Sequence, residues 1–170
     1  MLSVIKTIVD KILSWIVIVL MAVITINVLW QVFSRFVLQN PSSFTEELAR
    51  YMLIWIGILG AAYVAGQKLH LAIDLLSSKL KGKAKSSLEI FIQLCIFAFS
   101  FFVLLIGGIR LVYITLELNQ ISAALQVPLG YVYLVLPVSG ALMMFYSAYF
   151  IIEEFAKIKV AKKFHNHLNN

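Results

Sequence analysis

Apolar residues in this chain fall into four long runs with few polar side chains inside them. The runs cover about residues 12–38, 46–66, 87–113 and 129–152. A helix needs about 20 apolar residues to cross a hydrocarbon core about 30 Å thick, and each run reaches this length. The pattern predicts an all-α integral membrane protein, with four transmembrane helices in a single membrane domain over residues 1–170. The first and third runs are longer than required, so we expect these helices to tilt or to extend beyond the bilayer.

The connection between the second and third runs has a helical pattern of its own. Its apolar residues recur at intervals of four, three and four: Leu69, Ile73, Leu76 and Leu80. Polar residues fall largely between them, which predicts a short amphipathic helix at about residues 69–81, lying in the headgroup plane and ending near Gly82. An irregular basic loop is the alternative.

Composition and charge agree with a membrane protein and add an orientation. The chain is 62% hydrophobic and 13% charged, with a net charge of +6. Lysines precede the first run, lie between the second and third, and follow the fourth in a basic tail at residues 153–170, whereas the connections at about 39–45 and 113–127 contain no Lys or Arg. The positive-inside bias therefore predicts that both termini and the middle loop are cytoplasmic. Contact with anionic phospholipid headgroups accounts for the basic charge, and no nucleic-acid partner is needed.

The first connection has the residue types of a tight helical hairpin. Pro41 ends the first helix, because proline lacks an amide donor and forces its predecessor out of the helical region. Ser43 and Glu46 have the spacing of a capping box that opens the second helix. Glu46 and Glu47 then lie in its first turn, where the helix dipole favours negative charge.

Two basic residues flank these glutamates. Arg50 follows Glu46 by four residues, and Arg35 lies in the last turns of the first helix. A tight hairpin would bring Arg35 towards Glu46 or Glu47 and form a charge cluster near the membrane surface. The cluster could be an ion-pair staple between two helices, a contact with a partner subunit, or an ion relay. The relay is disfavoured because no acidic residue lies near the centre of any run.

Polar residues form a stripe on the first helix. Asn27, Gln31 and Ser34 are spaced by four and three residues and lie on one face together with Arg35. Polar groups facing lipid are costly, so we expect this stripe to face protein or headgroups.

Small residues recur on the second helix. Gly57, Ala61 and Ala65 follow one another at intervals of four, and Gly60 lies beside them. This spacing is typical of helices that approach another helix closely, either in the same chain or in a partner. Pro137 predicts a kink in the fourth helix.

The residues that would indicate chemistry are missing from the runs. All three histidines, His70, His165 and His167, lie outside them, so the sequence offers no intramembrane histidine pair for haem and disfavours a redox subunit. No metal-ligand spacing or catalytic motif is present, and we expect neither enzymatic activity nor a cofactor. A free-standing transporter of the small multidrug type, acting as a homodimer, is the alternative to a scaffold. It would require an acidic residue deep in a helix.

Four segments together resemble one known family. They are Arg35-Phe-Val-Leu-Gln-Asn-Pro41, Phe44-Thr-Glu-Glu-Leu-Ala-Arg50, Lys68-Leu-His70-x-x-x-Asp74 and Val127-Pro-Leu-Gly130. In this order they resemble the DctQ family, the small four-helix membrane subunit of tripartite ATP-independent periplasmic (TRAP) transporters, and overall the sialic-acid branch represented by SiaQ. The Glu-Glu-Leu-x-Arg block is the most specific part.

The resemblance implies a division of labour among three proteins in the bacterial inner membrane and periplasm. A periplasmic solute-binding protein would deliver an organic acid, such as sialic acid or a C4-dicarboxylate. A large permease subunit of the DctM or SiaM type would carry the substrate and sodium sites. The small subunit would be a scaffold without substrate ligands, and Arg35, Glu46, Glu47 and Arg50 would match the charged hairpin of the family.

Overall fold

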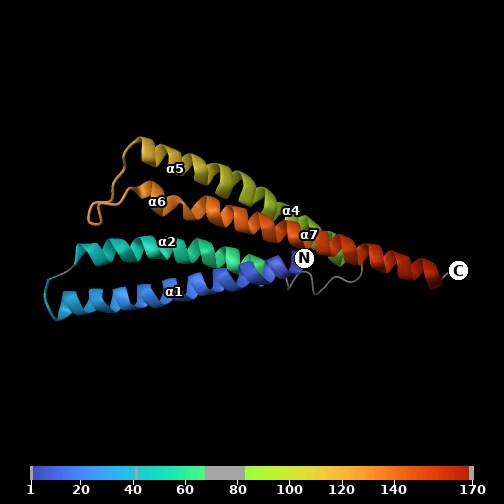
Figure 1. Cartoon of the computed structure of the whole chain (residues 1–170), viewed down its shortest axis with the longest axis horizontal. Coiled ribbons are helices and arrows are strands. Elements are labelled where there is room, and N and C mark those ends of the chain that lie inside the picture. The colour runs from blue at the N-terminus through green and yellow to red at the C-terminus, as the bar shows by residue number, and fades with distance from the viewer. Residues whose placement is uncertain (1, 41, 68–82, 169–170) are drawn as a thin grey trace.

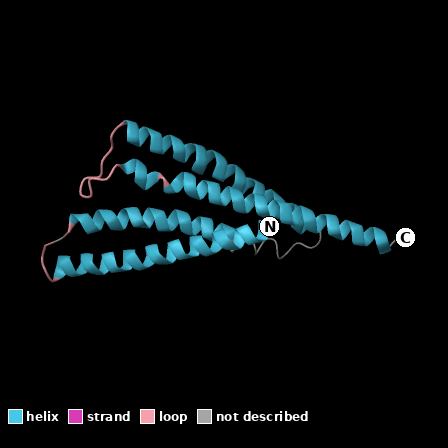
Figure 2. Ribbon diagram, in the orientation of Figure 1, coloured by secondary structure: helices cyan, strands magenta, loops and turns pink. Residues whose placement is uncertain are grey.

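The computed structural model describes residues 2–40, 42–67 and 83–168, and this part of the chain is helical with short loops (Figures 1 and 2). The elements are α1 (Leu2–Phe36), α2 (Ser43–Gly66), α4 (Lys83–Phe99), the π-helix η1 (Ser100–Gly107), α5 (Gly108–Glu117), α6 (Leu129–Tyr133) and α7 (Val135–Leu168). Four helical stretches are long and apolar enough to cross a membrane: Ser3–Phe36, Ser43–Gly66, Lys85–Glu117 and Leu129–Ala156. The predicted fold class is confirmed. The amphipathic helix predicted at residues 69–81 lies outside the described residues.

The first and last helices are longer than the apolar runs that predicted them. Helix α1 begins at Leu2 instead of near residue 12, and α7 continues to Leu168 through the segment predicted as a basic tail. Neither extension contains glycine or proline, so nothing in the sequence terminates the helix there. In α1 the extension is also stabilised by an ion pair between Lys6 and Asp10, one turn apart.

The helices form one layer in the order α1, α2, α7 and the composite helix α4–η1–α5 (Figure 1). Helix α7 packs against α2 on one side and against α4 and η1 on the other, while α6 packs against α5. In an apolar 18-residue stretch of the first and of the third span only 6% is buried inside the molecule, compared with 22% and 33% in the second and fourth. The outer helices therefore present most of their apolar surface to their surroundings. The buried core lies where α1, α2 and α7 meet: Leu13, Leu59, Ala62, Val135, Tyr146 and Phe150.

Two glycines allow α7 to approach the composite helix closely. A Cβ atom on Gly140 would lie 2.9 Å from the Cβ of Leu104 and 2.9 Å from the amide nitrogen of Leu105, both in η1. A Cβ atom on Gly108 would lie 2.9 Å from the Cδ of Pro137. The π-helical segment thus coincides with a close approach of α7 to the composite helix.

The kink predicted at Pro137 is present as a break between α6 and α7. Helix α6 ends at Tyr133 and α7 starts at Val135. Because Pro137 has no amide proton, it cannot donate to the carbonyl of Tyr133 one turn earlier. The neighbouring carbonyl of Val132 accepts a 2.9 Å hydrogen bond from the indole of Trp55 on α2. The Trp55 side chain thereby gives this backbone carbonyl at the break a hydrogen-bond donor from the neighbouring helix.

Candidate functional site

The carboxylate of Glu47, in the first turn of α2, binds the loop at residues 118–128 that joins α5 to α6. Its two oxygens accept five hydrogen bonds of 2.7 to 3.2 Å from the hydroxyls of Tyr51 and Ser122 and the backbone amides of Ala123, Ala124 and Leu125. Three successive amides pointing at one acceptor form an anion-binding backbone arrangement, and the anion here is a side chain of the same protein. We call this arrangement the Glu47 latch. It joins α2 to a loop about 75 residues further along the chain.

The latched loop has a defined backbone conformation. Asn119 and Gln126 have positive φ angles of 47° and 54°, in the left-handed region that residues other than glycine seldom adopt. The Gln126 side chain donates to the carbonyl of Ala123 at 2.9 Å, and Ile121 forms an isolated bridge with Pro128. These contacts, together with Glu47, hold the loop in one shape at the end of the helical layer.

The cap of α2 lies one residue earlier than predicted. The N-cap is Ser42, whose hydroxyl accepts from the amide of Thr45 at 3.4 Å, and the helix begins at Ser43. The predicted capping box from Ser43 to Glu46 is therefore wrong. Moving the cap by one residue leaves the side chain of Glu46 free to point outward.

The four residues of the predicted charge cluster do not lie together in the structure. Glu46 pairs with Arg50 at 3.7 Å, and both side chains are more than half exposed, which makes this a weak surface pair. Arg35 is exposed and has no ion pair within the described ranges. The expectation that Arg35 would approach Glu46 or Glu47 is not met, because the oxygens of Glu47 are occupied by the loop and Glu46 points outward.

The predicted polar stripe of α1 lies partly against α2. Asn27 is buried and donates a 2.8 Å hydrogen bond from Nδ2 to the carbonyl of Thr45. Ser34 is also buried, and its hydroxyl donates to the carbonyl of Gln31 at 3.0 Å. Gln31 itself is half-buried. The Asn27 hydrogen bond therefore joins α1 to the first turn of α2, two residues before Glu47.

The small residues of α2 face two directions. Ala65 is buried, and its neighbour Gly66 packs against the ring of Tyr146 on α7. Ala61 is exposed, and a Cβ atom added to Gly57 or Gly60 would meet nothing within 4 Å. Among the residues that the structure describes, no helix packs against the predicted small-residue surface at Gly57 and Gly60. We call Gly57, Gly60 and Ala61 the open face of α2.

A second polar cluster lies near the start of α1, and the sequence pattern did not indicate it. Asp10 pairs with Lys6 at 2.6 Å and accepts a 2.7 Å hydrogen bond from the hydroxyl of Tyr146. The Lys6 ammonium also lies 5.7 Å from the ring centres of Tyr146 and Phe150, within cation–π range. The available signal was an acid one turn after a lysine, since residues four apart lie on the same side of a helix.

Neither polar cluster has the composition of a catalytic or metal centre. Across residues 2–40, 42–67 and 83–168, no group of three or more His, Cys, Asp or Glu side chains could hold a metal ion. Both carboxylates are engaged in hydrogen bonds to other segments of the chain: Glu47 to the loop at residues 118–128 and Asp10 to Tyr146 on α7. In the described structure, the hydrogen bonds of Glu47 hold a loop and those of Asp10 hold a neighbouring helix.

Known proteins similar to this chain have names related to transport. Residues 24–157 match the family described as tripartite ATP-independent periplasmic transporters, DctQ component. The chain is 30% identical over 95 residues to the sialic acid TRAP transporter small permease protein SiaQ of Vibrio cholerae, covering 56% of this chain and 55% of SiaQ. It is 31% identical over 123 residues to the sialic acid TRAP transporter permease protein SiaT of Haemophilus influenzae, covering 68% of this chain and 18% of SiaT.

A further relative has a different solute in its name. The isethionate TRAP transporter permease protein DctMQ of Oleidesulfovibrio alaskensis is 32% identical over 99 residues, which cover 58% of this chain and 15% of DctMQ. The aligned part thus spans about half of SiaQ and less than a fifth of the two longer permeases. The matched family consists of transporter permease subunits, which are not enzymes. With the family match covering most of the four-helix layer, the chain belongs to the DctQ component family of TRAP transporters.

Proposed function

We propose that this chain is the small scaffold subunit of a TRAP transporter, acting with a large permease subunit and a periplasmic solute-binding protein. The observation that carries the proposal is the family match over residues 24–157. The fold supports it, since the helices form one layer with little buried surface on its outer members. A single layer offers broad apolar faces to a partner in the membrane.

The longer relatives support a large membrane partner. SiaT and DctMQ align with this chain over 18% and 15% of their own lengths, so the region similar to this chain is a small part of each permease. A separate small subunit then requires another chain to supply the rest. We place that partner against the open face of α2, because exposed small residues allow a second helix to approach closely.

The relatives' names support an organic acid as the transported solute. SiaQ and SiaT are named for sialic acid and DctMQ for isethionate, and both solutes are anions at neutral pH. We propose sialic acid as the first candidate and a C4-dicarboxylate as the next. Import would be driven by sodium, with the substrate and sodium sites in the large subunit.

The lysine distribution supports an orientation in the bacterial inner membrane. Lysine-rich segments at both termini and in the middle connection would be cytoplasmic. The Glu47 latch and the loop at residues 118–128 would then face the periplasm. A rigid loop there is suited to contact with the solute-binding protein, because little conformational entropy is lost when it docks.

Co-expression with the candidate large permease tests the proposal directly. We expect the two chains to co-elute from mild detergent as a stable 1:1 complex. Reconstituted in liposomes, the complex should take up sialic acid only when sodium and the solute-binding protein are both added. A chain that ignores the permease and transports by itself would overturn the proposal and favour the homodimeric small transporter.

A further inference from the structure

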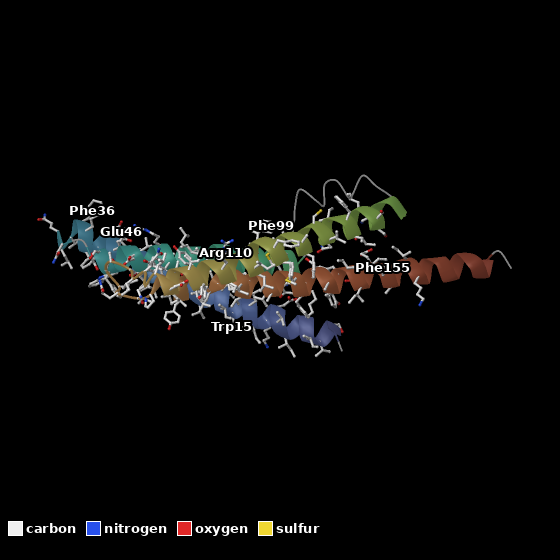
Figure 3. The ribbon with its side chains drawn as sticks, turned by 90° about the horizontal axis from the view of Figure 1, so that it is seen from above. Trp15, Phe36, Glu46, Phe99, Arg110 and Phe155 are labelled. Atoms are coloured by element: carbon white, nitrogen blue, oxygen red, sulfur yellow. The ribbon has the colours of Figure 1, made fainter. Side chains whose placement is uncertain are left out.

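The third span contains a π-helix near its middle. Phe99 and Arg110, labelled in Figure 3, lie just before and just after η1. Phe99 and Gly108 have ordinary α-helical backbone angles, with φ of −58° and −64°, so the irregularity is confined to η1. Segments of this kind are rare inside α-helices and are frequently found at functional sites.

The inward-facing positions around η1 recur at intervals of four residues. Ser100 and Gly108 are buried, and Leu104 between them lies against Gly140 of α7. In an α-helix of about 3.6 residues per turn, each interval of four rotates the side chain by about 40°, which makes about 80° between Ser100 and Gly108. The wider turns of a π-helix remove this drift. The third span therefore contains about one residue more than an α-helix with the same contacts would need.

The neighbouring helix is also irregular at this level. Gly108, the first residue after η1, lies against Pro137, and the break between α6 and α7 is at Leu134. Backbone hydrogen bonds around the break are long, at 3.4 Å from the amide of Leu134 to the carbonyl of Tyr131 and 3.3 Å from the amide of Val138 to the carbonyl of Leu134. Two antiparallel helices thus have irregular backbone at the same level, which is the arrangement expected of a hinge.

The segment beyond this level, residues 108–134, is joined by contacts of its own, and we call it the end unit. Leu116 in α5 fills the space beside Gly130 in α6. The amide of Leu129 donates to the carbonyl of Gln120 at 2.9 Å, which closes the base of the loop. These contacts join α5, the loop and α6, so a movement at the hinge would carry the end unit as one body.

Two side chains of α2 hold the end unit in place. Helix α2 packs against α7, whereas it has little backbone contact with α5 or α6. Its described hydrogen bonds to the end unit are the Glu47 latch and the bond from Trp55 to the carbonyl of Val132. We propose that the end unit is hinged at η1 and at the α6–α7 break, and that Glu47 and Trp55 hold it closed against α2. This motion is separate from the scaffold function proposed above, which requires only the closed state.

Electron paramagnetic resonance distances in the full chain test the hinge. Leu53→Cys on α2 and Tyr113→Cys on α5, both at exposed positions, carry spin labels in a Cys95→Ser background. A label on α5 reports on the end unit, because local motion of the loop leaves it in place. We expect one narrow distance in this background. Glu47→Gln combined with Trp55→Phe releases the end unit and should add a second, longer distance.

Matched variants separate the hinge from general loosening. Glu46→Gln with Trp30→Phe alters an exposed glutamate and an exposed tryptophan and should keep the single narrow distance. Deletion of Val103, an exposed residue of η1, removes the extra residue and lets the span become a continuous α-helix. In the released variant this deletion should abolish the longer distance. Pro137→Ala, which restores an amide donor at the break, should lower its population.

Three results would overturn the hinge. A released variant that keeps the single narrow distance would show that the end unit does not move without Glu47 and Trp55. An equal longer distance in the matched control would indicate general loosening of the layer, and a longer distance unchanged by both hinge variants would place the motion elsewhere. Circular dichroism and gel filtration check the fold of each variant. If the Val103 deletion does not fold, Pro137→Ala decides the location of the hinge.

Discussion

Tyr146 on α7 donates a 2.7 Å hydrogen bond to Asp10 on α1, across 136 residues of sequence. The same phenol ring fills the space beside Gly66, where a Cβ atom would lie 2.6 Å from its Cζ. One side chain therefore contacts α1 and α2 while belonging to α7. The polar end of Tyr146 determines which part of α1 lies beside α7.

Removing that hydroxyl should destabilise the layer. We expect Tyr146→Phe to lower the free energy of unfolding by about 1.5–3 kcal/mol, the usual contribution of a hydrogen bond to a charged group. Thermal or denaturant unfolding in detergent measures the change. Tyr113→Phe is the matched control, because Tyr113 is 65% exposed and should be neutral. A double-mutant cycle with Asp10→Ala, which removes the acceptor, should be non-additive, and simple additivity would contradict the bond.

Glu47→Gln should release the loop at residues 118–128. The substitution replaces one acceptor oxygen by an NH₂ group, which cannot accept from the amides of Ala124 and Leu125. We expect hydrogen exchange of these amides to accelerate roughly tenfold or more. The isosteric control is Glu46→Gln, whose carboxylate has only an exposed pair with Arg50, and it should leave exchange unchanged. Equal exchange in both variants would show that the latch does not order the loop.

Two glycine substitutions should have opposite effects on the isolated chain. Gly140→Ala places a methyl group 2.9 Å from η1 and should destabilise the chain by about 1–3 kcal/mol. Gly60→Ala places a methyl group in open space and should stabilise α2 by about 0.5–1 kcal/mol, because alanine favours helix. Melting temperatures in detergent distinguish them. If the permease packs on the open face of α2, Gly60→Ala should weaken co-elution despite the more stable fold.

Arg35→Leu should leave the stability of the isolated chain within about 0.5 kcal/mol, since Arg35 is exposed and has no ion pair in the described residues. Denaturant unfolding of the purified variant measures this. A large loss of stability would indicate that Arg35 does staple the hairpin. Reduced co-elution with the permease at unchanged stability would instead identify Arg35 as a partner contact.

The four spans could be predicted because the length requirement of a bilayer is a local property of the sequence. Apolar runs and the kink at Pro137 need no knowledge of distant residues. Helix ends were less predictable, since charged residues such as Lys6 and Lys159 are compatible with helix outside the hydrocarbon as well as with a tail.

The partners of Glu47 could not be predicted from spacing. Arg35 was expected to approach Glu46 or Glu47 because it is the nearest opposite charge across the hairpin, whereas Glu47 binds neutral backbone amides about 75 residues away. Every residue except proline has a backbone amide, so the sequence pattern does not indicate which amides will bind a carboxylate. Likewise, Gly57 and Gly140 look alike in sequence, and the fold alone determines which of them faces another helix.

The central position of α7 has a consequence for biogenesis. A ribosome releases the first hairpin, α1 and α2, long before α7, yet α7 provides the packing partner for α2 and for the composite helix. Until the last span has entered the membrane, the Glu47 latch is the main described contact between α2 and the residues that follow α5. A nascent chain that stops before residue 135 lacks this joining helix, so we expect its first hairpin and its composite helix to lie side by side only after the last span is made.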